Sequence, residues 1–414
     1  MKRLVVLGGG TAGTMVVSKL AKKLDPKQWS ITIVDQNNEH LYQPGLLLLP
    51  FGVYERNDLI KTRTQFFPPQ VNFMRGEIDR VEPDANRVLL ADGKVLDYDY
   101  LVMATGTTPR PDQTPGMDDP AIWHKSVFDF YTLDGSVGLR DALQKFQGGK
   151  LVIHITEMPI KCPVAMLEFA FLVDAYFEKR GIRDKVDITY VTPLEGAFTK
   201  PVSSAKLGGM LEARKIKLEP DFVIEQIDPD EKKLISMDER EVPFDLLVTV
   251  PLNMGADYVS RSGMGDDLNY VAVDKETFLS KKWKNVFAVG DGSDIPASKA
   301  GSVAHFAIDL FSENFVDYVQ GKPMHHKFDG HANCFIESGH GKGLLIDFNY
   351  TTEPLTGMFP LPVVGPMSLL KESRLNHMGK LAFRWIYWNM LLKGRRIPIP
   401  ALMSMTGKRV EPVK

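Results

Sequence analysis

Cysteine is nearly absent from this sequence, since Cys162 and Cys334 are the only two among 414 residues. Two cysteines exclude a disulfide-stabilised scaffold. Neither lies in a Cys-x-x-Cys or Cys/His spacing typical of a metal site, so we expect no bound metal. They are therefore either buried packing residues or a redox pair. An excess of charge is also missing, with 50 basic and 52 acidic residues, and this balance argues against a nucleic-acid partner.

Long apolar runs are missing as well. No stretch reaches the roughly 18 uninterrupted apolar residues that a membrane-spanning helix requires. The apolar start, MKRLVVLGGG, leads into a glycine-rich loop rather than a cleavage site, so we expect a strand there and no signal peptide. With 44% hydrophobic and 25% charged residues, the composition predicts a globular chain of two or three domains.

Residues 3–24, RLVVLGGGTAGTMVVSKLAKKL, predict a strand, a glycine turn and a helix. Gly8, Gly10 and Gly13 have the spacing that allows a tight turn, close approach of a pyrophosphate and close packing of helix on strand. The next predicted strand ends in Asp35, 22 positions beyond Gly13, where a carboxylate binds a ribose hydroxyl. This region predicts a dinucleotide site.

Two later strands end in turns that identify the dinucleotide. Residues 98–111, YDYLVMATGTTPRP, lead into Thr105 and Gly106, and residues 284–294, KNVFAVGDGSD, lead into Gly290 and Asp291. These turns resemble the later FAD fingerprints of the flavoprotein disulfide reductase superfamily, which has two dinucleotide-binding domains. The resemblance implies FAD as cofactor, with Asp291 at its ribityl and phosphate part.

The segment between those turns lacks glycine where a second nucleotide site needs it. Residues 150–156, KLVIHIT, and 187–192, DITYVT, predict a second Rossmann-like unit, but the connecting turn at 157–164 reads EMPIKCPV. Its prolines and Ile160 would hold the backbone away from a pyrophosphate, and no acid ends the second strand. We therefore expect the fold without a nicotinamide site.

Cys162 occupies that altered turn, directly before a predicted helix. Pro163 suits a first helical position, so Cys162 is expected at or next to the N-cap, where the helix dipole and Lys161 would favour a thiolate. The alternative is that Cys162 is a small apolar residue in a buried turn.

Four segments are similar to sulfide:quinone oxidoreductases: HLYQPG (40–45), KCPVAMLEF (161–169), HANCFIESGHGKGLLIDFNY (331–350) and HMGKLAFRWIYWNMLL (377–392). The resemblance implies oxidation of sulfide to zero-valent sulfur or polysulfide through Cys162 and Cys334, with electrons passing through FAD to a membrane quinone. Hydrosulfide would attack a bridge between the two cysteines, leaving a persulfide and a thiolate. Which cysteine contacts the flavin stays open, with Cys334 as the candidate.

The same resemblance assigns three more roles. Glu168, with His305 as a further candidate, would transfer protons; Lys380 would stabilise the reduced flavin; and Phe383 would contact the quinone. Some members carry a third cysteine near Tyr131 or Thr132, which this sequence lacks.

Residues 375–392 combine an apolar and aromatic surface with a polar stripe formed by His377, Lys380 and Arg384. Followed by KGRR at 393–396, they predict a monotopic anchor on the cytoplasmic membrane rather than a span. The alternative is a buried helix at a domain or dimer contact, and a homo-oligomer stays open.

The predicted fold class is α/β, with two Rossmann-like domains and a membrane-associating C-terminal segment. We expect an FAD-binding domain at 1–112 and 254–325, a second Rossmann-like domain without an NAD site at 113–253, and a C-terminal quinone region at 326–414. Three alternative functions are a type II NADH:quinone oxidoreductase, a flavocytochrome c sulfide dehydrogenase flavoprotein subunit and a flavin-bound binding module. The first needs the missing glycine turn, the second an export signal, and the third has no use for a cysteine pair.

Overall fold

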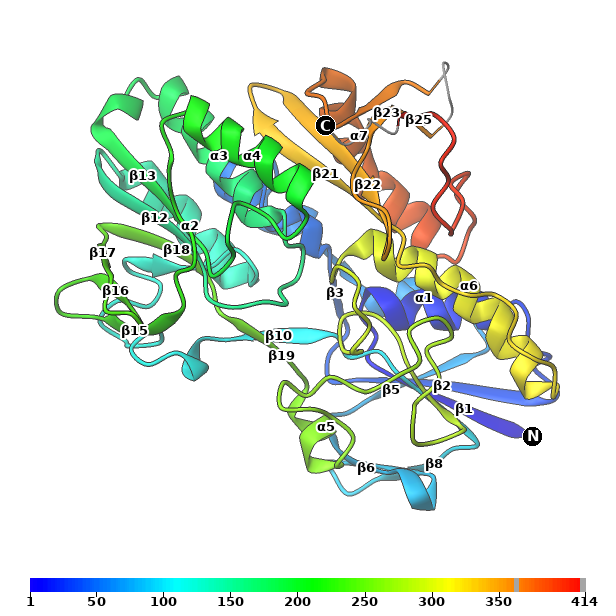
Figure 1. Cartoon of the computed structure of the whole chain (residues 1–414). Coiled ribbons are helices and arrows are strands. Elements are labelled where there is room, and N and C mark those ends of the chain that lie inside the picture. The colour runs from blue at the N-terminus through cyan, green and yellow to red at the C-terminus, as the bar shows by residue number, and fades with distance from the viewer. Residues whose placement is uncertain (361–364, 410–414) are drawn as a thin grey trace.

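The computed structural model describes residues 1–360 and 365–409, and it places a five-stranded parallel sheet around the N-terminal strand. The sheet brings together segments far apart in the sequence, because β1 is flanked by later strands on both sides. Its order is β20 (Val286–Ala288), β9 (Tyr100–Met103), β1 (Lys2–Leu7), β2 (Trp29–Asp35), β5 (Val71–Arg75). Helices α1 (Thr11–Leu20) and α6 (Gly301–Val319) pack side by side against it (Figure 1). The predicted strand, glycine turn and helix are therefore confirmed.

A second five-stranded parallel sheet is formed by the inserted segment. Its order is β11 (Val127–Phe128), β18 (Leu246–Val250), β12 (Gly149–Ile155), β13 (Val186–Val191), β14 (Lys217–Glu219). The helices of this unit are α2 (Leu133–Lys145), α3 (Ala165–Lys179) and α4 (Pro201–Ala213). β12 and β18 are almost continuous apolar runs, as expected for strands covered on both faces.

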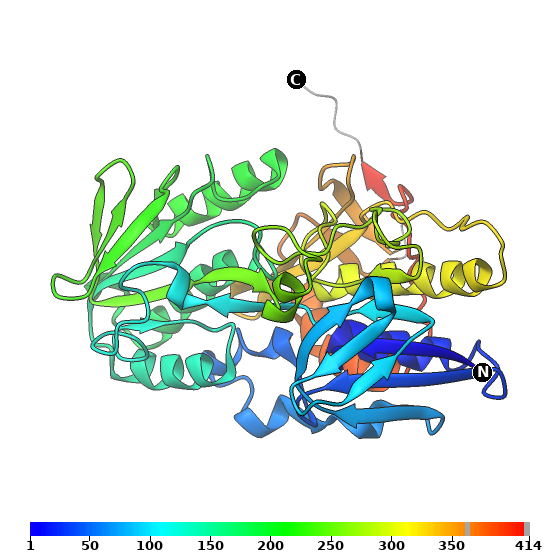
Figure 2. The ribbon, with the colours of Figure 1, turned by 90° about the horizontal axis from the view of Figure 1, so that it is seen from below.

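The two units are joined by a pair of antiparallel strands, β10 (Thr107–Arg110) and β19 (Leu252–Gly255). Figure 2 shows the two units lying on either side of this link. Smaller antiparallel sheets decorate both units: β3 (Glu39–Leu41) with β4 (Ile60–Thr62), β6 (Ile78–Glu82) with β7 (Arg87–Leu90) and β8 (Val95–Asp97), and β15 (Ile224–Asp228) with β16 (Lys233–Ser236) and β17 (Glu241–Pro243). The short helix α5 (Asp257–Arg261) follows β19.

The C-terminal region is a third sheet covered by one helix. Its order is β21 (Ala332–Gly339), β22 (Lys342–Phe348), β24 (Met367–Leu369), β23 (Thr356–Phe359), β25 (Lys408–Arg409), and α7 (Arg374–Ile386) packs on β21 and β22. A short π-helix, Tyr387–Leu391, continues α7. β21 also lies against α3, so the third sheet closes over both Rossmann-like units (Figure 1).

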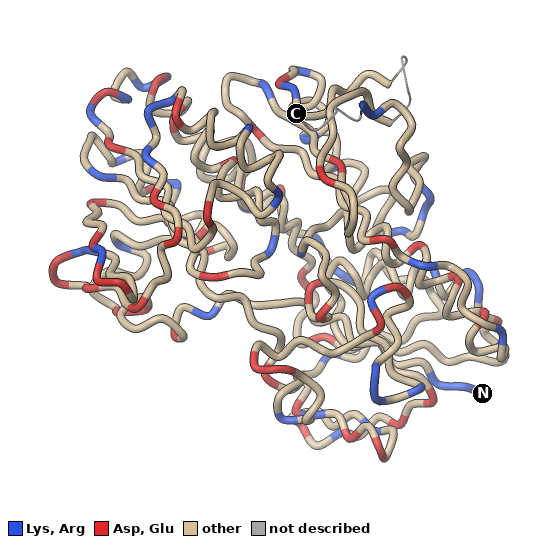
Figure 3. The backbone as a smooth tube through the Cα atoms, viewed as in Figure 1, with Lys and Arg blue, Asp and Glu red and all other residues tan. Residues whose placement is uncertain are grey.

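The predicted domain limits remain a prediction, although the strands of each large sheet fall inside them. β19 crosses the limit proposed between residues 253 and 254, and residues 361–364 and 410–414 of the C-terminal region lie outside the described residues. Charges of both signs are distributed over the whole backbone (Figure 3). In the described ranges, no helix is both long and apolar enough to cross a membrane.

Candidate active site

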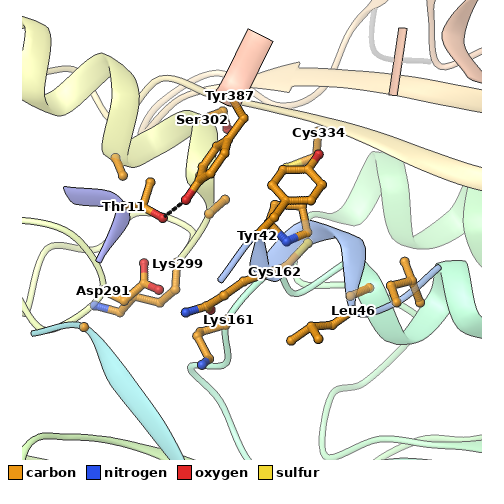
Figure 4. A pocket seen from close by; sticks show the side chains of 18 of the residues that line it. Thr11, Tyr42, Leu46, Lys161, Cys162, Asp291, Lys299, Ser302, Cys334 and Tyr387 are labelled. Atoms are coloured by element: carbon orange, nitrogen blue, oxygen red, sulfur yellow. Dashed lines mark hydrogen bonds between the residues drawn. The ribbon is translucent and has the colours of Figure 1, made fainter. Parts of the chain in front are cut away.

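One cavity is lined by all three parts of the molecule (Figure 4). Its walls come from the glycine turn after β1, the turns after β9 and β20, the segment before α3, the start of α6, β21 and α7. The predicted site residues that line it are Gly10, Thr105, Gly106, Cys162, Glu168, Gly290, Asp291, Cys334, Lys380 and Phe383. The fold therefore brings Cys162 and Cys334, 172 positions apart, into one cavity, and both are free thiols in this structure.

Gly8 and Gly13 shape the first turn rather than lining the cavity. A Cβ at Gly13 would lie 1.8 Å from the carbonyl oxygen of Gly8, so only glycine allows this close approach of helix and strand. Gly8 has a φ of 93°, which favours glycine as well. Asp35 does not line the cavity either. It accepts a 2.7 Å hydrogen bond from the N–H of Gly9 and forms an ion pair with Arg63. Its contact with a ribose stays a prediction.

Two helix N-termini point at the cavity without side-chain caps. α1 begins after Gly10 and α6 begins after Ala300, and neither N-cap side chain accepts a hydrogen bond. A Cβ at Gly10 or Gly301 would meet no atom within 4 Å. Open space beside free helical N–H groups suits the phosphates and polar ring edge of a dinucleotide. The residues present therefore fit the flavin dinucleotide that the turns predict.

Asp291 lines the cavity together with two buried lysines, Lys161 and Lys299. Burial raises the pKa of Asp291, while the nearby ammonium groups of Lys299 and Lys161 act in the opposite direction. Burial likewise lowers the pKa of both lysines, with Asp291 opposing that shift. An acidic group and two basic groups thus lie together beside the Gly290 turn, and burial disfavours the charged form of each.

Cys162 lies further from the start of α3 than the sequence predicts. α3 begins at Ala165 with Val164 as its N-cap, and Cys162 has a positive φ of 48°. Its N–H donates to the carbonyl oxygen of Lys299 at 2.7 Å instead of facing the cavity as a helix N–H. The expected N-cap position is therefore wrong by two residues, because the left-handed backbone of Cys162 and its hydrogen bond to Lys299 keep this residue outside the helix.

The expected thiolate is also wrong. Burial raises the pKa of Cys162 well above its ordinary value, and Cys334 and Glu168 add to the shift, whereas Lys380 opposes it. Burial, together with Glu168, raises the pKa of Cys334 to about 12. Desolvation outweighs any dipole effect here, so both reduced cysteines carry protons at neutral pH.

Glu168 forms an ion pair with Lys380 across the cavity wall, joining α3 to α7. Glu168 is 1% exposed, and the same carboxylate oxygen accepts the N–H of Glu337 at 2.9 Å. Burial raises the pKa of Glu168 to about 7, although Lys380 opposes the shift. For Lys380 burial acts to lower the pKa, but Glu168, Glu337 and Cys162 outweigh it and the pKa is raised. This pair places a carboxyl group that titrates near neutrality beside the two thiols.

The polar stripe of the C-terminal helix faces the protein, as predicted. His377, Lys380 and Arg384 contact Glu337, Glu168 and Asp58, respectively. The aromatic residues divide differently from the expectation: Trp385 is 62% exposed, whereas Tyr387 and Trp388 are buried. Burying these two rings fastens the π-helix to the FAD-type domain.

The chain is similar over nearly its whole length to sulfide:quinone oxidoreductases. It is 29% identical to the mitochondrial sulfide:quinone oxidoreductase of Dictyostelium discoideum, over 95% of this chain and 86% of that relative. The family model of pyridine nucleotide-disulphide oxidoreductases matches residues 2–153. The X-ray structure of the Aquifex aeolicus sulfide:quinone oxidoreductase superposes with a TM-score of 0.79, at 21% identity and covering 95% of this chain and 92% of that one. This chain is a homologue of sulfide:quinone oxidoreductases.

The type II NADH:quinone oxidoreductase of Staphylococcus aureus is a more limited relative. The match is 29% identical but covers 30% of this chain and 31% of that relative. The likeness to sulfide:quinone oxidoreductases, by contrast, includes both cysteine segments and the C-terminal helix. The alternative of an NADH-oxidising enzyme is therefore not favoured.

Several residues of this sulfide:quinone oxidoreductase homologue were not predicted as site residues. The hydroxyl of Tyr387 lies 2.7 Å from Thr11 Oγ1 and 2.7 Å from His40 Nε2, linking the π-helix to the glycine turn and to the 40–45 loop. Burial lowers the pKa of His40 to about 3, so the ring is neutral. The likeness of residues 40–45, HLYQPG, to sulfide:quinone oxidoreductases was the sequence signal that could have identified His40. His305 is not among the residues lining the cavity and lies beside Asp309 in α6, so the structure does not support it as a proton carrier.

Proposed function

We propose that this chain is an FAD-dependent sulfide:quinone oxidoreductase that uses Cys162 and Cys334 as its redox pair. The observation that carries the proposal is the single cavity that holds both cysteines beside the three turns of a flavin site. The second Rossmann-like unit supports it, because its turn is occupied by prolines and Cys162 instead of glycines.

The flavin would be held at the carboxyl ends of β1, β9 and β20. The N-terminus of α1 would receive the pyrophosphate, Asp291 the ribityl part, and Lys380 with the start of α6 the pyrimidine edge. When bound, FAD accepts two electrons from the sulfur side and releases them to a quinone.

The protein's own groups then manage thiol and proton chemistry. Hydrosulfide would attack a bridge between Cys162 and Cys334, forming a persulfide on one cysteine and freeing the other sulfur. Because burial favours the protonated thiol, the freed sulfur becomes an electron donor only when a base holds its proton. Glu168, whose pKa is raised by burial to about 7, is the carboxylate placed to do so.

The quinone would enter beside α7. Phe383 lines the cavity and its ring lies 6.4 Å from that of Tyr387. On the outer face of α7, Leu375, Met378 and Trp385 are exposed at helical spacing. We infer that this face rests on the cytoplasmic membrane, so a lipid-soluble quinone reaches the cavity directly from the bilayer.

The deciding experiment compares electron donors under anaerobic conditions. Purified protein with bound FAD is mixed with sulfide or with NADH, and the flavin absorbance is followed before and after adding a short-chain quinone. Sulfide should bleach the flavin and quinone should restore it, while NADH should not bleach it. Bleaching by NADH and not by sulfide would overturn the proposed function.

A further inference from the structure

A line of contacts, one of them through a backbone N–H, leads from the buried Glu168–Lys380 pair toward the protein surface. Glu168 accepts the backbone N–H of Glu337, and the Glu337 side chain lies beside His377, with 2.8 Å between Oε2 and Nδ1. The three elements that contribute, α3, β21 and α7, come from two different parts of the fold. Ordinary packing of β21 on α3 does not require a second buried carboxylate at this point.

Exposure is greatest at the outer end of this line. The side chains of Glu168 and Glu337 are 1% and 2% exposed, that of Lys380 is 13% exposed and that of His377 is 28% exposed. His377 is therefore the member that water reaches most freely. Histidine exchanges protons near neutral pH, which suits an outlet.

Glu337 is coupled electrostatically to the inner pair. Its negative charge contributes to raising the pKa of Glu168 and of Lys380, although burial has the largest effect on both. Within the described ranges, the second carboxylate oxygen of Glu337 is buried and has no protein hydrogen-bond partner. A buried carboxylate oxygen without a partner is energetically costly and calls for a structural or functional explanation.

The proposed reaction requires such a connection. One hydrosulfide, one quinone and one proton yield zero-valent sulfur and one quinol: sulfur gives up two electrons and its proton, and the quinone takes up two electrons and two protons. One proton per turnover must therefore come from solvent. Glu168 is 1% exposed, so a proton that reaches this carboxyl group needs a route through the protein.

We propose that Glu337 and His377 carry protons between solvent and the Glu168–Lys380 pair. His377 takes the proton from water at Nε2 and releases one from Nδ1 to Glu337, whose carboxyl group passes it to the inner pair. The same route works in reverse for protons lost by the thiols. This inference rests on the proposed function, since it assigns a route for that reaction.

Other charged and titratable groups surround the route. Arg384 pairs with Asp58 at 3.3 Å and stacks over Tyr54, on the side of α7 facing the 49–59 segment. Cys162 and Cys334 face the inner pair. Arg384 is held in an ion pair with Asp58, so His377 is the group at the outer end suited to proton exchange.

The test uses the FAD-loaded enzyme with the variants Glu337→Gln and His377→Ala. His340→Ala is the matched control, because His340 also pairs with a carboxylate, Glu178, at 3.0 Å but lies at the far turn of the same hairpin. Turnover with sulfide and quinone is measured in H₂O and D₂O, and for His377→Ala also with added imidazole. FAD content and the KM for sulfide report on folding and substrate binding.

We expect kcat to fall about ten-fold in both variants. This is less than the roughly 10²–10⁴-fold loss on removing a direct acid or base, because slower proton transfer by other routes remains. The solvent isotope effect should increase, and imidazole should restore His377→Ala. Unchanged kcat and isotope effect, or a loss that imidazole does not restore, would overturn the relay. If the parent enzyme does not reduce quinone with sulfide, the proposed function fails instead, and the two failures are thus distinct.

Discussion

The N–H of Cys162 donates a 2.7 Å hydrogen bond to the carbonyl oxygen of Lys299, so the altered turn of one Rossmann-like unit is tied to the helix start of the other. Lys161 and Lys299 pair here as an isolated parallel bridge. The side-chain oxygen of Asn253 accepts the N–H of Lys161 at 3.1 Å. Cys162 is held at the cavity by its own backbone hydrogen bond and by the Asn253 side chain on the preceding residue, rather than by a helix cap.

Asn253→Ala should loosen this arrangement. Asn253 is 0% exposed and its side chain also donates to the carbonyl of Pro251 at 2.8 Å, so two buried partners would lose their hydrogen bonds. We expect a loss of about 2–4 kcal/mol in the free energy of unfolding and slower sulfide-driven bleaching. Denaturant unfolding and stopped-flow absorbance measure both. Asn285→Ala, outside the cavity, is the control, and an unaffected bleaching rate in Asn253→Ala would contradict the positioning role.

Serine at either cysteine position should abolish the reaction with sulfide while leaving the flavin bound. A hydroxyl cannot form a disulfide or a persulfide, so Cys162→Ser and Cys334→Ser should each bleach at least about 10²-fold more slowly with sulfide. The measurement is anaerobic stopped-flow absorbance, and dithionite, which needs no cysteine, should still reduce the flavin in both variants. Normal bleaching by sulfide in both would leave the cysteines as packing residues.

The titration of Glu168 should appear in the pH profile of kcat. Because burial raises the pKa of Glu168 to about 7, its carboxylate form, which accepts the thiol proton, grows as the pH rises through that value. At saturating sulfide we expect kcat to rise from pH 6 to pH 8 with a midpoint of about 7, since kcat reports the bound complex. Glu168→Gln should show a flat profile and a kcat lower by about 10²-fold or more. A rising limb that persists in the glutamine variant would assign it to another group.

Local sequence patterns predicted the parts of the fold that depend on turn chemistry. The glycine spacing after residues 2–7 and the strand ends before Thr105 and Gly290 identified the first sheet, because these turns permit few other structures. The absence of glycine at 157–164 also predicted a second unit with an altered turn. The thiolate at Cys162 was wrong because a helix-start argument does not include burial, which only the assembled fold determines.

Long-range partners could not be predicted from spacing. The contacts of Glu168 with Lys380 and Glu337 join residues about 170 to 210 positions apart, and nothing local in the sequence specifies them. The hydrogen bond between Tyr387 and His40 likewise joins residues far apart in the sequence. In the same segment the helix periodicity did place His377, Lys380 and Arg384 on the inner face, because an amphipathic pattern depends only on neighbours three and four residues apart.

Phe383→Ala should weaken quinone use without slowing the sulfide half of the reaction. An aromatic contact contributes about 1–1.5 kcal/mol, so the KM for quinone should rise about ten-fold. Sulfide-driven bleaching should stay at the parent rate, because a phenyl ring takes no part in thiol–disulfide exchange. Leu381→Ala is the control on the same helix, outside the cavity lining. Equal KM values for the two variants would argue against a quinone contact at Phe383.

The outer face of α7 should bind membranes through three side chains. Leu375, Met378 and Trp385 are 49%, 61% and 62% exposed, which is unusual for large apolar residues gathered on one helix face. Burying each in lipid contributes about 1.5–3 kcal/mol, so replacing all three with serine should lower the liposome partition coefficient by about 10²-fold or more. Co-sedimentation with anionic liposomes measures this. Serine at Val202, Val223 and Met237, which are 48%, 52% and 66% exposed on the second unit, removes similar apolar surface elsewhere. Equal losses from the two triple variants would show that α7 is not the docking face. A loss of liposome binding confined to the α7 variant, with turnover on a water-soluble quinone retained, would support entry of lipid-soluble quinone beside this helix.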